Sequence, residues 1–322
     1  MKILSLFEPI RAELEVVEER LHQAVEVEDH QLREILRYLL DSGGKRIRPA
    51  LVVLASKFHD SDIEQVLPLA ASVELLHTAT LVHDDLLDGS VLRRGNPTLN
   101  ANLSTGAVIL VGDYLFARAA DLAAATDSVP VVSIFARTLM TICSGELKQA
   151  FDQDGWRRTK EDYYQGTYSK TASLFAASTE AGALLSGASP PTVQALRDYG
   201  HNLGMAFQIV DDILDFTGDE RELGKPIGSD LRQGTITLPL LLFLETHPEV
   251  DILPSIFEED GGREERIVSL VDMVSDSSAT GSAREAAERF TVESKEAIQD
   301  LSPNEYRQVM LDLADYLLER RL

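Results

Sequence analysis

Two clusters of aspartate residues, at 84 to 88 and at 211 to 215, are the part of this sequence best suited to chemistry. Each has the pattern Asp-Asp-x-x-Asp in an apolar stretch with helical periodicity. Residues four apart share a helix face, so Asp84 and Asp88 would present two carboxylates from neighbouring turns. In half-buried surroundings unit charges ~4 Å apart repel by roughly 4 kcal/mol at an effective dielectric constant near 20. Each cluster therefore predicts a bound cation, and oxygen ligands alone favour Mg²⁺ shared with phosphate groups.

Basic groups near the first cluster are informative in a chain whose formal net charge is -23. In chain order they are Lys45 and Arg48, which follow Gly43-Gly44, then His77, then Arg93 and Arg94. His77 lies about two turns, ~10 Å, before Asp84 on one helix stripe. Because an arginine fork grips phosphate oxygens in a bidentate manner, these groups predict a phosphate site beside the metal-bound one. Arg46 is interpreted as a solvated or salt-bridged surface residue.

Further polar donors are associated with the second cluster. Gln208 lies one turn before it, and Lys170-Thr171 precede it in the chain. Lys225 belongs to a segment from Thr217 to Gly228 that holds three glycines and a proline. This segment is predicted to be a mobile lid over an anionic ligand. Together these donors are suited to hold a departing diphosphate.

The composition limits the classes of function. With 322 residues and 44% hydrophobic content, the chain can bury a sizeable core, and 6% aromatic content favours helices. The strongly negative charge argues against nucleic acid and anionic lipid as partners. A single cysteine, Cys143, excludes an internal disulfide framework and fits a reducing compartment. No signal peptide and no apolar run of about 18 residues is evident, so we expect a cytoplasmic protein.

Long helices are expected to position these groups. Apolar residues recur at spacings of three and four from Pro9 to Leu40, as in amphipathic helices. Further helices are predicted over 49–58, 64–88, 101–125, 128–153, 160–186 and 190–216. Strand patterns are almost absent, and Arg93 to Pro97 is predicted to be a loop. Because no interdomain linker is evident, we expect one helical domain over residues 1–322.

With these motifs in order, the chain resembles the trans-isoprenyl diphosphate synthases, or polyprenyl synthetases, and most of all their medium- and long-chain, octaprenyl-type members. The shared motifs are Gly-Gly-Lys-x-x-Arg-Pro at 43–49, the cluster at 84–88 with Arg93-Arg94-Gly95, Gly-x-x-Phe-Gln-x-x-Asp-Asp-x-x-Asp at 204–215, and Gly224-Lys225-Pro226. The resemblance covers nearly the whole chain from Gly43 onwards. It implies an all-α fold, a single large bundle with a central cavity between the two clusters, and a homodimer.

The resemblance also implies roles for individual residues and about three Mg²⁺ ions. Metal ligands are implied at Asp84, Asp88 and Asp211, with Asp85, Asp212 and Asp215 in support. Isopentenyl diphosphate contacts are implied at Lys45, Arg48, His77 and Arg94. Allylic diphosphate contacts are implied at Arg93, Lys170, Thr171, Gln208 and Lys225. One departure is Thr235, at a position where the family often has lysine.

The implied reaction is ionisation of an allylic diphosphate, attack on the cation by isopentenyl diphosphate, and loss of a proton. Farnesyl or geranylgeranyl diphosphate would serve as the primer. In the family, residues just before the first cluster line the product cavity, and here Ala79 and Thr80 are both small. A long product for a quinone side chain, passed to a membrane prenyltransferase, is therefore expected.

Four alternatives stay open at this point, and the least specific is a metal-binding helical bundle with a structural role only. A geranylgeranyl or farnesyl synthase would use the same chemistry and stop at a shorter product. A terpene cyclase or head-to-head condensing enzyme would have no need for the second phosphate site. A subunit of a heteromeric synthase would be expected to have lost aspartates if it were only regulatory, and both clusters are intact here.

Overall fold

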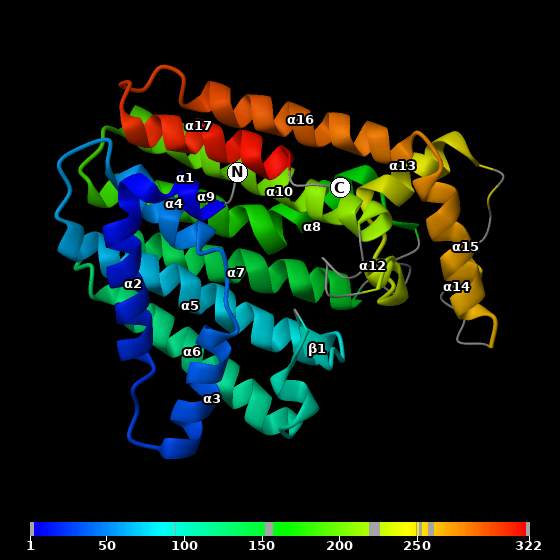
Figure 1. The fold of residues 1–322 in the computed structure, drawn as a ribbon, viewed down its shortest axis with the longest axis horizontal. Coiled ribbons are helices and arrows are strands. Elements are labelled where there is room, and N and C mark those ends of the chain that lie inside the picture. Colours follow the sequence, from blue (N-terminus) through cyan, green and yellow to red (C-terminus); the bar gives the residue numbers. More distant parts are fainter. Residues whose placement is uncertain are drawn as a thin grey trace. The chain divides into compact units, whose positions relative to one another are not determined.

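The computed structural model describes residues 3–93, 95–151, 157–218, 226–248, 250, 253–256 and 261–319. These residues form helices almost throughout (Figure 1), so the predicted all-α class is confirmed. Contacts divide the chain into two compact units. The first unit contains Met1–Leu139, Leu174–Gly200 and Lys295–Leu313, and the second contains Met140–Ser173, His201–Ser294 and Ala314–Leu322. The single domain over residues 1–322 stays a prediction.

The elements up to α7 follow the chain in this order: α1 (Ile3–Leu6), η1 (Glu8–Ile10), α2 (Arg11–Ala24), α3 (His30–Asp41), α4 (Ile47–Ser56), α5 (Ile63–Leu87), β1 (Leu92–Arg93), β2 (Asn96–Pro97), η2 (Leu99–Ala101), α6 (Thr105–Ala124) and α7 (Val129–Phe151). The later elements are α8 (Lys160–Thr167), η4 (Tyr168–Ala172), α9 (Ser173–Leu185), α10 (Pro190–Thr217), α12 (Ser229–Arg232), α13 (Leu238–Thr246), α14 (Leu253–Ile256), α15 (Arg263–Ser275), α16 (Ala279–Ala297) and α17 (Glu305–Leu318).

Helix α5 is the core helix of the first unit and carries the first aspartate cluster. Asp62 begins it by accepting a hydrogen bond from the Glu64 N–H at 3.0 Å. The helix is apolar on all sides, and α4 and α6 pack along it (Figure 1). Each fully buried leucine, such as Leu75 or Leu76, contributes about 1.5–3 kcal/mol. Among the described residues α5 alone has the length and hydropathy of a membrane span, but 78% of its apolar window is buried.

The amphipathic region from Pro9 to Leu40 forms two helices, α2 and α3. Helix α2 ends at Ala24, whose carbonyl oxygen accepts from Arg118 Nε at 2.8 Å. Helix α3 begins after Asp29, whose side chain accepts from the Leu32 N–H at 2.8 Å. A satisfied C-terminal carbonyl and a new N-cap explain why the helical pattern is interrupted between them.

The region predicted as one helix over 160–186 contains a wider turn. Helix α8 starts with a capping box of Thr159 and Asp162, and residues Tyr168–Ala172 then form a π-helical turn before α9. On α7, a Cβ added to Gly145 would lie 2.5 Å from the Ser169 Cβ, so the glycine permits close packing against this turn. Lys170 and Thr171 thus lie within a π turn, a feature frequent at functional sites.

Candidate active site

The first aspartate cluster lies at the C-terminal end of α5, where Asp88 caps the helix. Asp84 is half-buried, Asp88 is exposed and Asp85 is buried. The carbonyl end of a helix carries partial negative charge, so carboxylates placed there make the local potential more negative. The cluster is therefore a place where a cation would be stabilised.

Asp85 has an arginine partner. Arg93 Nε donates to Asp85 Oδ1 at 2.8 Å and links β1 to the end of α5. Burial raises the pKa of Asp85, and the charge of Arg93 offsets part of that effect. Arg93, predicted to bind the allylic diphosphate, is therefore held by Asp85 in this structure. Arg94 lies outside the described residues.

The predicted isopentenyl diphosphate residues of the first unit come from neighbouring elements. Lys45 is exposed just before α4, and Arg48 is half-buried on α4 with its guanidinium carbon 4.9 Å from the Phe175 ring centre. His77 is half-buried on α5, against which α4 packs. The structure thus brings together the two helices that carry these groups, and their role in phosphate binding stays a prediction.

In the second cluster, on α10, Asp212 is enclosed while Asp211 is only half-buried. Tyr163 donates its hydroxyl to Asp212 Oδ2 at 2.5 Å, and Gln208 Nε2 donates to Asp212 Oδ1 at 2.8 Å. Burial raises the pKa of Asp212 well above that of an ordinary carboxyl, although these two hydrogen bonds lower it. Both oxygens of Asp212 are used within the protein, so Asp211 is better placed to meet a ligand.

Asp215 holds the chain segment that follows the predicted lid. It is fully buried, and its Oδ2 accepts from the Asp230 N–H at 3.0 Å. Its carbonyl oxygen accepts from the Gly228 N–H at 2.7 Å. Most of the lid, including Lys225, lies outside the described residues. Asp215 therefore connects the end of α10 to the start of α12.

The predicted allylic diphosphate donors of the second unit are linked to one another. Thr171 Oγ1 donates to Gln208 Oε1 at 2.7 Å, and Gln208 in turn donates to Asp212. Lys170 is exposed, with its Nζ 3.2 Å from Glu146 Oε1. The π turn and α10 thus share a continuous chain of hydrogen bonds that fixes the orientation of the Gln208 amide.

Sequence reasoning did not single out Tyr163 or Arg158. Arg158 Nη1 donates to the Ile236 carbonyl oxygen at 3.3 Å, so a cation lies one residue from Thr235, where the resembled family often has lysine. Its guanidinium carbon also lies 5.8 Å from the Tyr163 ring centre. Tyr163 lies on α8, and only its contact with Asp212, which is distant in the sequence, identifies it as part of the site.

The first cluster fits a metal ion that a substrate helps to bind. Among the residues that the structure describes, no group of three or more His, Cys, Asp or Glu side chains could hold a metal by itself. Mg²⁺ commonly takes one or two carboxylates and completes its shell with phosphate oxygens and water. Asp84 and Asp88, accessible and one turn apart, supply such a partial set. We therefore expect a cation here together with an anionic ligand.

Replacing Tyr163 by phenylalanine is expected to lower the free energy of unfolding by about 1–3 kcal/mol, because buried Asp212 loses a donor. The matched control is Tyr164→Phe, since Tyr164 is half-buried beside it and its ring packs 5.9 Å from that of Phe290. Urea unfolding monitored by circular dichroism measures both variants. An equal loss in the two would show that the Tyr163 hydroxyl contributes nothing specific.

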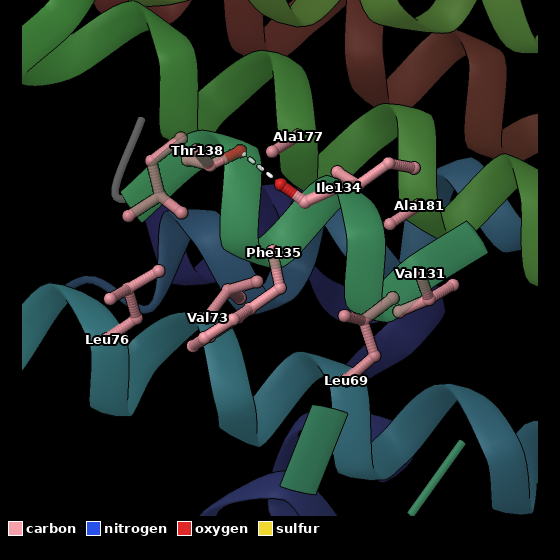
Figure 2. A pocket seen from close by; sticks show the side chains of 10 residues that line it. Leu69, Val73, Leu76, Val131, Ile134, Phe135, Thr138, Ala177 and Ala181 are labelled. Atoms are coloured by element: carbon pink, nitrogen blue, oxygen red, sulfur yellow. Dashed lines mark hydrogen bonds between the residues drawn. The ribbon is translucent and has the colours of Figure 1, made fainter. Parts of the chain in front are cut away.

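An apolar pocket lies among three helices of the first unit (Figure 2). The pocket is narrow, because the space inside it that the centre of a water-sized sphere can reach is only about 10 Å³. The lining residues are Leu69, Val73 and Leu76 of α5, Val131, Ile134, Phe135 and Thr138 of α7, and Leu174, Ala177 and Ala181 of α9. Thr80 follows the α5 stripe at the next helical spacing, whereas Ala79 is fully buried about 100° away from it.

Comparison with known proteins gives consistent matches. A family model described as polyprenyl synthetase matches residues 29–274. Heptaprenyl diphosphate synthase component 2 of Geobacillus stearothermophilus is 38% identical over 320 residues, which cover 99% of each chain. A polyprenyl synthase from Caulobacter crescentus CB15, solved with calcium and isoprenyl diphosphate, has a TM-score of 0.93 at 34% identity and covers 100% of this chain and 98% of its own. A geranylgeranyl pyrophosphate synthase from Lactobacillus brevis has a TM-score of 0.88 at 31% identity, with 98% of each chain covered.

Proposed function

Because this chain belongs to the polyprenyl synthetase family, and is therefore a prenyltransferase that makes a prenyl diphosphate, we propose a finer function for it. It adds isopentenyl diphosphate units repeatedly to farnesyl or geranylgeranyl diphosphate and makes a long all-trans product for a quinone side chain. The observation that carries the proposal is the apolar pocket, which α5 lines on the stripe that leads through Thr80 towards Asp84.

In the proposed reaction the carbon–oxygen bond of the allylic diphosphate breaks, and the double bond of isopentenyl diphosphate attacks the resulting cation. A proton then leaves to the released diphosphate. Mg²⁺ bound by Asp84, Asp88 and Asp211, supported by the other three aspartates, would neutralise charge on the departing diphosphate. The calcium and isoprenyl diphosphate in the Caulobacter protein support this assignment.

The basic and polar residues would hold the two diphosphates in reacting positions. Isopentenyl diphosphate, which keeps its diphosphate, would lie against Lys45, Arg48, His77 and Arg94. The departing diphosphate would lie against Arg93, Lys170, Thr171, Gln208 and Lys225. Arg93 would leave Asp85 or share it with the ligand, since Asp85 holds it now. The apolar side chains that line the pocket would exclude water from the growing chain.

The position of the pocket along α5 supports a long product. Leu76 and Leu69 lie 8 and 15 residues before Asp84, or about 12 and 22 Å along the helix axis. An extended isoprene unit of four carbon–carbon bonds spans about 5 Å, given bond lengths near 1.5 Å. The third to fifth units of a growing chain would therefore reach the pocket. The heptaprenyl relative supports a long product, and the geranylgeranyl relative keeps a short one as the alternative.

We further propose a homodimer that works in the cytoplasm and passes its product to a membrane prenyltransferase. Large apolar side chains are exposed on α6 and α7, such as Leu110 at 69% and Val129 at 82%. Such residues are costly to leave in water and favour a protein partner. A second candidate function is suggested by the name of the Geobacillus relative, a component 2. On that reading, this chain would be the aspartate-bearing subunit of a two-component synthase.

The test is incubation of the purified chain with Mg²⁺, farnesyl diphosphate and labelled isopentenyl diphosphate, followed by chain-length analysis of the dephosphorylated products. Products longer than geranylgeranyl support the proposal, and products that stop at that length or shorter contradict the long-chain part. If the chain alone binds both diphosphates but forms no product, the two-component alternative is favoured.

A further inference from the structure

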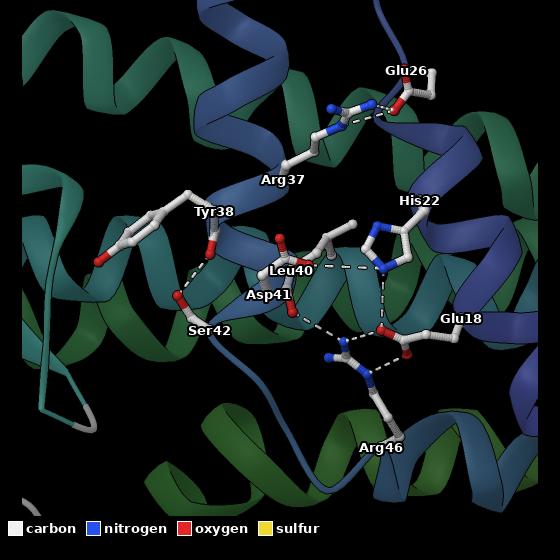
Figure 3. A network of polar contacts seen from close by, with 9 residues as sticks. All are labelled: Glu18, His22, Glu26, Arg37, Tyr38, Leu40, Asp41, Ser42 and Arg46. Atoms are coloured by element: carbon white, nitrogen blue, oxygen red, sulfur yellow. Dashed lines mark hydrogen bonds and ion pairs between the residues drawn. The ribbon is translucent and has the colours of Figure 1, made fainter.

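Arg46 joins three helices around the segment that leads into α4, and Figure 3 draws its contacts with Glu18 and Leu40. Its Nε and Nη2 donate to Glu18 Oε2 and Oε1 on α2 at 2.9 and 2.8 Å. Its Nη1 donates to Glu74 Oε1 on α5 at 2.9 Å. Its Nη2 also donates to the Leu40 carbonyl oxygen on α3 at 3.2 Å. One guanidinium thus uses its planar fork to fix four acceptors, which a lysine could not do.

Arg46 forms salt bridges, as one of the two predicted interpretations had it, but its expected place on the surface is corrected by its burial. The Arg46 side chain is 17% exposed, and that of Glu74 is only 6% exposed. Burial opposes the charge of Arg46, yet the hydrogen bonds that Arg46 donates to Glu18 and the charge of Glu74 raise its pKa above the ordinary value. The pKa of Glu18 is lowered, chiefly by its hydrogen bond with Arg46. A buried carboxylate such as Glu74 depends on this pairing, because leaving it unpaired would be strongly destabilising.

The backbone of Arg46 is also unusual. It has φ 49° and ψ 34°, the left-handed conformation, at the N-cap of α4. A residue other than glycine adopts this conformation at a cost of about 1–2 kcal/mol. The contacts of the side chain offset that cost and keep the chain in this tight turn. The turn sets the direction in which α4 begins.

We infer that Arg46 is a positioning residue for the isopentenyl diphosphate site. It lies between Lys45 and Arg48 in the chain, and it is fastened to α5 at Glu74, three residues or about 4.5 Å along the axis before His77. The fork of Arg46 therefore fixes the two cations of the turn relative to the histidine of α5. This inference rests on the proposed function, which assigns those three residues to one diphosphate.

The test compares Arg46→Asn with a variant at the other end of α4. Asparagine tolerates the left-handed backbone, so the change removes the fork without adding backbone strain. The double variant Arg46→Asn/Glu74→Gln also removes the unpaired buried charge and preserves folding if the single variant unfolds. The matched control is Lys57→Met. Lys57 caps the C-terminus of α4 and pairs with Glu13 of α2 at 2.5 Å, with both side chains 20% exposed.

For the Arg46 variants we expect KM for isopentenyl diphosphate to rise about tenfold or more, with kcat and the allylic KM within about threefold of the parent values. Calorimetric titration with isopentenyl diphosphate alone should show the same loss of affinity. Lys57→Met should lower stability and leave both KM values unchanged. Arg46→Lys, which keeps the charge without the fork, should remain impaired.

Three results would overturn the inference. An unchanged KM for isopentenyl diphosphate in the folded double variant would show that Arg46 only stabilises the fold. The same conclusion would follow if the Arg46 variants and Lys57→Met showed equal losses of kcat and equal rises of both KM values. If the parent protein neither binds isopentenyl diphosphate nor forms a product, the proposed function fails first, and the inference fails with it.

Discussion

Replacing Asp84 by asparagine is expected to lower kcat/KM for condensation by about a thousandfold or more, or ~4 kcal/mol of lost transition-state stabilisation. Asparagine keeps the shape of the side chain and removes its charge. Because Asp84 is half-buried at the negative end of α5, it is well placed to hold a cation that neutralises the departing diphosphate. Initial rates with labelled isopentenyl diphosphate measure the loss.

The control for this variant is Asp60→Asn, an identical change at an exposed loop residue before α5. Its rate should stay within about twofold of the parent rate, as for most surface substitutions. Circular dichroism should show that both variants keep their helices. Removal of a carboxylate from a helix C-terminus is itself mildly favourable, so Asp84→Asn should not lower stability. A rate within tenfold of the parent value would contradict the role of Asp84 in metal binding.

The sequence was sufficient to place the helices that carry the candidate site. Periodicity predicted a helix over 64–88, and α5 covers Ile63–Leu87. It predicted 101–125 for α6, which instead begins at Thr105 because Ser104 accepts a hydrogen bond from the Ala107 N–H and caps it. Helix ends depend on individual capping hydrogen bonds, which periodicity does not report.

Features that depend on contacts between distant residues could not be predicted in this way. The π turn at Tyr168–Ala172 adds a residue to a continuous helical pattern, so the sequence predicted an unbroken helix. The assignment of Arg46 to the surface was wrong because Glu18 and Glu74 are each 28 positions away. The enclosure of Asp212 likewise depends on Tyr163, 49 positions earlier. Charge and spacing identified groups suited to chemistry, and packing decides which of them meet a ligand.

Replacing Thr80 by phenylalanine is expected to shorten the product to geranylgeranyl length or less. Leu69, Val73, Leu76 and Thr80 follow one another at spacings of four, three and four, so they form one stripe of α5. A ring at position 80 would lie ~6 Å along the axis from Asp84 and would meet the growing chain before it reaches the pocket. Chain-length analysis of the products measures the change.

Thr80→Val is the matched control, because it keeps the volume of threonine and removes only the hydrogen bond from Thr80 Oγ1 to the His77 carbonyl oxygen, 2.7 Å long. It should leave the product length unchanged. Ala79, one residue earlier, is fully buried and lies off the stripe, so a ring there should act less through the pocket and more through overpacking, at about 1–3 kcal/mol.

The opposite change is expected when the pocket is widened at its single aromatic lining residue. Phe135 of α7 points into the pocket (Figure 2), and Phe135→Leu should lengthen the product by at least one isoprene unit. If Thr80→Phe shortens the product and Phe135→Leu lengthens it, one channel must run past both residues. A loss of stability alone would not change the product length in opposite directions. If both variants give the parent length, the chain grows elsewhere, and the pocket is only a packing defect of the core.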